Sequence, residues 1–350
     1  MPGLGSDSAI RYHSICISLL IEISNDEKEQ YNEDVLTAAT ILRFYEQIEG
    51  LYANTMDSCV HDAHVVSAST IDGHSETYLN AIQFIINTQQ NESFYSYRSI
   101  YGPPRDNDVH VIPSVSLRHS ACLIALRQEI WSAFLSQRPF RLPVCPSNDY
   151  ATFSPANHFV WTNRILVWAA DLLSFCFGNQ SMTPEQSTER WMALKEFEQR
   201  WDAQKPSAFK PIYYREADPD RNQHFPQIWH MNSCQVARAQ HIELGRILLA
   251  VSDPMSVSRL GIGVVARNVS LEEELRSITQ RLCGLAVSNP NCPPALVTAA
   301  VGISVCGEYF VNPGEQEALV KLLKDLQFQH AWPTEATVRA LRAAWLASSQ

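Results

Sequence analysis

The residues that most resemble a metal site are His61 and His64, which stand three positions apart beside Cys59 and Asp62. Two metal ligands on one turn of a helix would have this spacing. The surrounding segment 58–70 is rich in small and polar residues, and no second pair of ligands follows at the spacing of a zinc site. The sequence therefore predicts no metal site and no cofactor.

Two glycine-containing segments resemble motifs of nucleotide binding and of nucleophilic catalysis. Segment 260–266 has the glycine order of a dinucleotide-binding turn, but a turn at 253–256 stands where the motif requires a buried strand. Segment 302–307 resembles the turn that presents a catalytic serine, yet it has one residue too many and lies in an apolar helical run. We interpret the first segment as a loop between helices and Ser304 as a buried helix serine.

Residues suited to acid–base chemistry are scattered along the chain. Four histidines lie among aromatic residues and are expected to be packed or half-exposed: His224, His230, His241 and His330. Four bases near aromatic residues are isolated in the sequence: Arg138, Arg141, Lys205 and Lys210. The sequence shows neither a nucleophile–base pair nor a glycine loop that would cradle a phosphate. It therefore predicts no catalytic residues and a protein that is not an enzyme.

The charge balance argues against direct reading of DNA. The 350 residues carry a net charge of -10, with 27 Lys and Arg against 37 Asp and Glu, and the bases form no stripe. Because DNA binding depends on clustered cations, we expect no sequence-specific DNA binding from this chain. Hydrophobic residues make up 45%, which is a globular composition, and the length is sufficient for a large core without disulfides.

The nine cysteines and the apolar runs exclude two further classes. No two cysteines are separated by only two residues, so there is no zinc cluster, and most lie in apolar runs where a free thiol behaves as a small hydrophobe. The longest uncharged stretch, 282–307, is broken by prolines, and its last part, 295–307, is shorter than the about 20 residues that span a bilayer. We expect this part to be a buried core helix and the protein to have no membrane partner.

Helical periodicity dominates the chain. Apolar residues recur at spacings of three and four over 34–52 and 116–137, and 159–177 carries charge only at Arg164 and Asp171. A helix with so little charge belongs in the centre of a large bundle. Helix starts are expected at four capping residues: Thr183, Ser270, Asn312 and Thr334.

Strand signals are few, and the longest connections contain aromatic residues and prolines. Short alternating patterns occur at 110–115 and 209–214. The long connections cover 92–113, 141–155 and 206–226. The sequence predicts an all-α fold, a large irregular helical bundle or array with long ordered loops. It divides the chain into a disordered or irregular N-terminus, 1–11, and one helical domain, 12–350.

The motifs, taken in order from about residue 12 to residue 345, resemble the fungal-specific transcription factor domain, the large regulatory region that follows the six-cysteine zinc cluster in many fungal transcription factors. The stretches that carry the resemblance are Leu117-Arg118-His119-Ser120, Leu126-Arg127-Gln128-Glu129, Pro139-Phe140-Arg141, 191–201, 206–214, Leu282-Cys283-Gly284-Leu285-Ala286, Ser288-Asn289-Pro290, Pro293-Pro294-Ala295-Leu296 and His330-Ala331-Trp332-Pro333-Thr334. The zinc-binding cysteines of the family have no counterpart in this chain.

This resemblance implies a nuclear regulator of transcription by RNA polymerase II that acts without its own zinc cluster. Its partner would be a DNA-binding transcription factor or another transcription protein. Relative to the family the chain is expected to be N-terminally truncated, through a mispredicted start, a truncated paralogue, or a regulator without a DNA reader. The alternative is a metabolite-sensing domain or a scaffold that controls a partner transcription factor, with a small apolar ligand in the aromatic interior.

Overall fold

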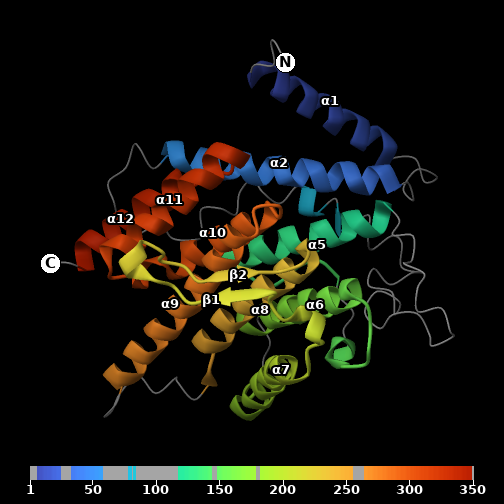
Figure 1. Ribbon diagram of the computed structural model, residues 1–350. Coiled ribbons are helices and arrows are strands. Elements are labelled where there is room, and N and C mark those ends of the chain that lie inside the picture. The colour runs from blue at the N-terminus through green and yellow to red at the C-terminus, as the bar shows by residue number, and fades with distance from the viewer. Residues whose placement is uncertain are drawn as a thin grey trace.

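The computed structural model describes residues 6–24, 33–57, 78–80, 82–83, 117–143, 148–178, 182–254 and 264–348, and these residues form an all-α fold, as predicted (Figure 1). The α-helices are α1 (Ser6–Ser24), α2 (Glu33–Asp57), α5 (Leu117–Leu135), α6 (His158–Phe177), α7 (Pro184–Gln204), α8 (Ser233–Val251), α9 (Val264–Ser288), α10 (Pro294–Cys306), α11 (Pro313–His330) and α12 (Glu335–Ser348). Two three-residue strands, β1 (Tyr213–Arg215) and β2 (Gln227–Trp229), interrupt the helices.

The helices pack around one hydrophobic core. Helix α6 packs against α8, α8 against α9, and α9 against α10, while α2 lies along α5. In Figure 1, α1 and α2 lie along the upper side of the molecule and α7 lies along its lower side, with α5, α6, α8 and α10 between them. Of the helices described, none is long and apolar enough to cross a membrane.

Helix α6 is the buried centre that its lack of charge predicts. Trp168 and Leu172 have no exposed surface. The helix begins at Asn157, whose side chain accepts a hydrogen bond from the Val160 amide at 3.0 Å. Its one arginine, Arg164, is also buried, and it donates to the carbonyl of Ser154 at 2.9 Å.

The predicted helix starts are correct at three of the four capping residues. Thr183 and Gln186 form a reciprocal capping box on α7, and the Asn312 side chain accepts from the first amides of α11. Helix α12 follows Thr334 directly. The predicted start at Ser270 is wrong, because α9 already begins at Val264 and no helix-breaking residue separates the two positions.

Two further expectations differ from the structure. Residues 6–11 were expected to be irregular, but they form the first turns of α1. The helix contains the apolar residues of segment 15–23 and continues towards the N-terminus through residues that tolerate a helix. Ser304 lies in helix α10, as predicted, but it is exposed and not buried, since it faces away from the apolar side of that helix and donates to the Ala300 carbonyl at 2.8 Å.

The connection between α7 and α8 is an ordered excursion that contains the two strands. They pair antiparallel, with Tyr213 opposite Trp229 and Arg215 opposite Gln227. The expected strand at 209–214 is therefore displaced, since Phe209 ends a short 3-10 turn and β1 begins at Tyr213. The strand expected at 110–115 lies outside the described residues. Of the loop expected at 260–266, residues 260–263 also lie outside them, while 264–266 form the first turn of α9 and not a loop.

Candidate interaction surface

The two-stranded hairpin carries several large apolar side chains that are exposed to solvent. Large side chains on β1, on β2 and beside them are between 41% and 71% exposed. We call this set the aromatic hairpin; it consists of Ile212, Tyr213, Tyr214, Trp229 and Met231. Aromatic residues and methionine are enriched at the centres of protein interfaces, so a group of this composition marks a candidate contact surface.

The face of the hairpin is fixed by cross-strand contacts. Tyr213 and Trp229 are directly opposed, and their ring centroids lie 5.5 Å apart. The Ile212 amide donates to the Trp229 carbonyl at 2.8 Å. Paired rings at directly opposed positions stabilise an antiparallel pair. The surface is therefore presented in one arrangement.

One edge of the hairpin is closed by helix α9. The Ile228 amide donates to Ser288 Oγ at 3.0 Å, and Asn289 Nδ2 donates to the Ile228 carbonyl at 2.8 Å. The His230 amide donates to Asn289 Oδ1 at 3.1 Å. The backbone of Ile228 therefore points towards α9 and not towards β1.

The other edge of the hairpin, along β1, has the opposite orientation. Tyr214 is the residue that pairs with Ile228. In an antiparallel ladder, the two members of a pair that does not exchange backbone hydrogen bonds both direct their amide groups outwards. The amide and carbonyl of Tyr214 consequently point away from β2, on the side where a further strand would add.

The segment before the hairpin is held by a buried arginine. The Arg238 guanidinium lies 3.9 Å from the Phe209 ring centroid and 4.5 Å from that of Trp201, and its Nη2 donates to the Phe209 carbonyl at 3.2 Å. Gln235 adds a hydrogen bond to the Ala208 carbonyl at 2.8 Å. Burial lowers the pKa of Arg238 to about 9. These contacts anchor the hairpin to helix α8.

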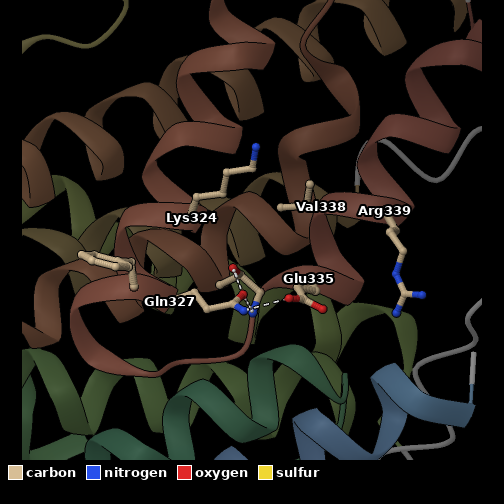
Figure 2. Close-up of a pocket in the computed structure, with 7 residues that line it drawn as sticks. Lys324, Gln327, Glu335, Val338 and Arg339 are labelled. Carbon is tan, nitrogen blue, oxygen red and sulfur yellow. Dashed lines mark hydrogen bonds between the residues drawn. The ribbon is translucent and has the colours of Figure 1, made fainter.

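A hollow between α11 and α12 is a second candidate surface (Figure 2). It has a volume of about 450 Å³ and is lined by Lys324, Gln327, Phe328, Thr334, Glu335, Val338 and Arg339. Gln327 ties the two helices together, because its Oε1 accepts from the Thr334 amide at 3.1 Å and its Nε2 donates to Glu335 at 3.1 Å. Phe328 is 92% exposed at its rim. The hollow is open to solvent, and charged side chains (Lys324, Glu335 and Arg339) stand among its lining residues, so the aromatic hairpin is the better candidate surface.

Arg138, expected to be an isolated base, instead belongs to a buried ion cluster. Glu129 has no exposed surface and pairs with Arg43 of α2 and with Arg138, whose Nη2 lies 3.0 Å from Glu129 Oε2. The Arg141 amide donates to Glu129 Oε1 at 3.0 Å. Burial raises the pKa of Glu129, but the two guanidinium groups outweigh it and hold that pKa below its usual value. The cluster joins α2 to α5 and so contributes to the fold.

The remaining candidate residues do not assemble into a site. In the described ranges, no group of three His, Cys, Asp or Glu side chains could hold a metal ion, and His61 and His64 lie outside those ranges. His241 is fully buried, His224 and His230 are half-buried, and His330 is exposed, which differs from the expectation for His330. Burial lowers the pKa of His230 to about 4.

Sequence reasoning did not identify Trp229 and Met231 as surface residues. The signal available is the apolar cluster at 225–231 between a proline-rich connection and a helix start, but it is too short to reveal a strand. Comparison of the chain with protein-family models, curated proteins and solved structures found no match. The resemblance to the fungal regulatory domain therefore stays a hypothesis.

Proposed function

We propose that this chain is a nuclear regulator of transcription by RNA polymerase II that acts through protein contacts and not by reading DNA. Its partner is a DNA-binding transcription factor or another transcription protein. Support comes from the ordered resemblance along the chain and from its all-α architecture. The net charge of -10 supports a partner that supplies the DNA contacts, since phosphate contacts need grouped cations.

The observation that carries this proposal is the aromatic hairpin. The exposed ring pair of Tyr213 and Trp229 on one face of the hairpin is stabilised when another surface removes it from water. The Tyr214 backbone, directed away from β2, offers hydrogen-bonding groups to a polypeptide in extended conformation. The occupant we assign is therefore an extended segment of the partner protein, which adds a strand beside β1 and places apolar side chains on Tyr213 and Trp229.

A transcription reporter tests this function. The chain is fused to a heterologous DNA-binding module in a fungal host, and reporter output is compared with that of the module alone. We expect a clear change in output from the fusion. The double variant Tyr213→Ser, Trp229→Ser should lose at least about 80% of that change, as expected when central interface aromatics are removed.

The matched control replaces exposed apolar residues away from the hairpin. Val265→Ser with Val269→Ser on α9 removes side chains that are 77% and 48% exposed, and it should leave reporter output unchanged. Protein levels are compared by immunoblot, so that loss of output is separated from loss of protein. A fusion that does not alter output, or a hairpin variant that matches the parent, would contradict the proposal.

A further inference from the structure

Arg127 of helix α5 has a guanidinium with buried donors that lack partners. Its Nε and Nη2 atoms make no contact with solvent and have no hydrogen-bond partner in the described part of the chain. The residue as a whole still keeps some accessible surface, so it is not sealed in the core. A buried cationic donor without an acceptor is costly, and most proteins avoid it.

The two unpartnered atoms are the pair that binds carboxylates. Nε–H and Nη2–H project side by side from one edge of the planar guanidinium, and their spacing matches the two oxygens of a carboxylate. The contrast with Arg138 is direct, because that arginine places its Nη1 and Nη2 on the two oxygens of Glu129 at 2.5 Å and 3.0 Å. Arg127 offers two donors on a different edge, Nε and Nη2, without a carboxylate in the described ranges.

Neighbouring side chains add donors and no negative charge. The indole of Trp131, one turn along α5, lies with its centroid 5.4 Å from the Arg127 guanidinium carbon, and its buried Nε1–H also lacks a partner. Among the described residues, the titratable groups that interact electrostatically with Arg127 are Cys234, Cys292 and His241. None of the three is a carboxylate.

Two cysteines that interact electrostatically with Arg127 lie at or near the amino ends of helices. Cys234 lies in the first turn of α8, and Cys292 lies two residues before α10 begins. The amino end of α8 carries partial positive charge. The first residues of α10 offer no free amide, because Pro294 has none and the Ala295 and Leu296 amides donate to the Cys292 and Pro293 carbonyls.

His241 contributes a neutral acceptor to the same site. Its Nδ1 lies 2.6 Å from the Ala237 carbonyl, so Nδ1 carries the proton, while the buried Nε2 lacks a partner. Burial, followed by the charge of Arg127, lowers the pKa of His241 to about 3, which keeps the ring neutral near pH 7. The imidazole is therefore neutral and adds no charge of its own beside Arg127.

We propose that Arg127 anchors a binding site for a small organic carboxylate, held by bidentate hydrogen bonds from its Nε and Nη2 atoms. This inference goes beyond the interaction function of the aromatic hairpin. It would make the helical domain responsive to a carboxylate metabolite. The ligand class differs from the small apolar ligand that the aromatic composition suggests.

Thermal melting of the purified, reduced chain tests the site with acetate, malonate and inorganic phosphate as probes, each at about 0.1 M and constant ionic strength, with chloride as the reference. We expect a saturable rise in Tm of about 2 °C with at least one carboxylate, and a smaller rise with phosphate. Arg127→Met should fold, because it removes an unpaired buried charge, and it should lose this rise. Arg127→Lys keeps the charge but not the paired donors, so it should lose most of the rise.

The control variant is Arg200→Met. Arg200 lies on α7, and its guanidinium carbon is 4.4 Å from the Phe153 ring centroid. It should respond to the probes as the parent does. The proposal is overturned if no carboxylate raises Tm, if Arg127→Met responds like the parent, or if phosphate matches the carboxylates and Arg127→Lys retains the response. Because this readout uses the purified chain alone, its failure is distinct from failure of the reporter experiment.

Discussion

Gly245 of helix α8 lies directly against the indole ring of Trp168 of helix α6. A Cβ atom at position 245 would stand 2.3 Å from two ring carbons of Trp168 and 3.4 Å from Leu172. The same indole donates from Nε1 to the Leu194 carbonyl at 3.2 Å. One side chain thus fixes α6 against α8 on one side and against α7 on the other, at the centre of the bundle.

Adding a methyl group at this contact should destabilise the fold. We expect Gly245→Ala to lower the free energy of unfolding by about 2–3 kcal/mol, because the large buried ring cannot move without disturbing its hydrogen bond to Leu194. The gain in helix propensity from replacing glycine, about 1 kcal/mol, offsets part of the strain but not all of it. Urea denaturation followed by circular dichroism measures the change.

A second substitution separates strain at this contact from a general effect of the mutation. In the Gly245→Ala background, Trp168→Phe should cost less than it does in the parent chain, because the smaller ring relieves the overlap. Additive effects of the two changes would show that the ring and position 245 do not press on each other.

The Glu129 cluster should be a strong determinant of stability. Glu129→Gln leaves Arg43 and Arg138 without a balancing charge in a buried environment. The expected loss is about 3–5 kcal/mol, as for other buried ion pairs that lose one partner. Chemical denaturation at pH 7 measures it, and a loss below about 1 kcal/mol would contradict the buried pairing.

The same carboxylate predicts a pH dependence with a definite sign. The pKa of Glu129 in the folded chain lies below its usual value of 4.5. A group with a lowered folded pKa stabilises the fold above its unfolded pKa, and this contribution is lost as the pH falls through the folded pKa. The difference in stability between the parent and Glu129→Gln should therefore be constant from about pH 7 to pH 5 and shrink below about pH 4.

Trp332 anchors the junction between α11 and α12. It is buried, and its ring centroid lies 5.6 Å from that of Phe44 on α2. Trp332→Ala should lower stability by about 3 kcal/mol, as for other buried aromatic truncations. Phe328→Ala, four residues earlier, is the matched control, since its ring is 92% exposed and should be worth little. Equal effects of the two changes in thermal melting would rule out this placement.

Ala331, just before that tryptophan, offers a stabilising change. It ends α11 with φ of 55°, in the left-handed region that favours glycine. Ala331→Gly should raise the free energy of unfolding by about 0.5–1 kcal/mol, because the strain of a Cβ in this conformation exceeds the added flexibility of the unfolded chain. Denaturation of both chains side by side measures the gain, and a loss of stability would contradict the assigned backbone conformation.

The features predicted correctly from sequence are those set by local rules. The scarcity of charge in segment 159–177 predicted that α6 lies at the centre. Thr183 with Gln186 predicted a helix start, because capping uses residues only three positions apart. The same rule failed at Ser270, where the residues from Val264 onwards also tolerate a helix, so a capping pattern inside a helix looks the same as one at its end.

The features missed depend on contacts between distant segments. The hairpin pairs three-residue strands across an ordered connection, and nothing local states that Tyr213 faces Trp229. Arg138 looks like an isolated base in the sequence, and no pattern in the sequence assigns Arg127 a separate role. Their different environments follow from packing, which brings Glu129 to Arg138 and leaves the Nε and Nη2 atoms of Arg127 without a partner among the residues described.

Whether the chain reaches promoters only through a partner can be measured by fluorescence anisotropy with promoter duplexes near physiological salt, alongside elemental analysis for zinc. With a net charge of -10 and no cation stripe, the chain should bind duplexes weakly, with the same affinity for every sequence, and should purify without stoichiometric zinc. Nanomolar binding that depends on sequence, or two zinc ions per chain, would contradict this and make the protein a transcription factor that reads DNA itself.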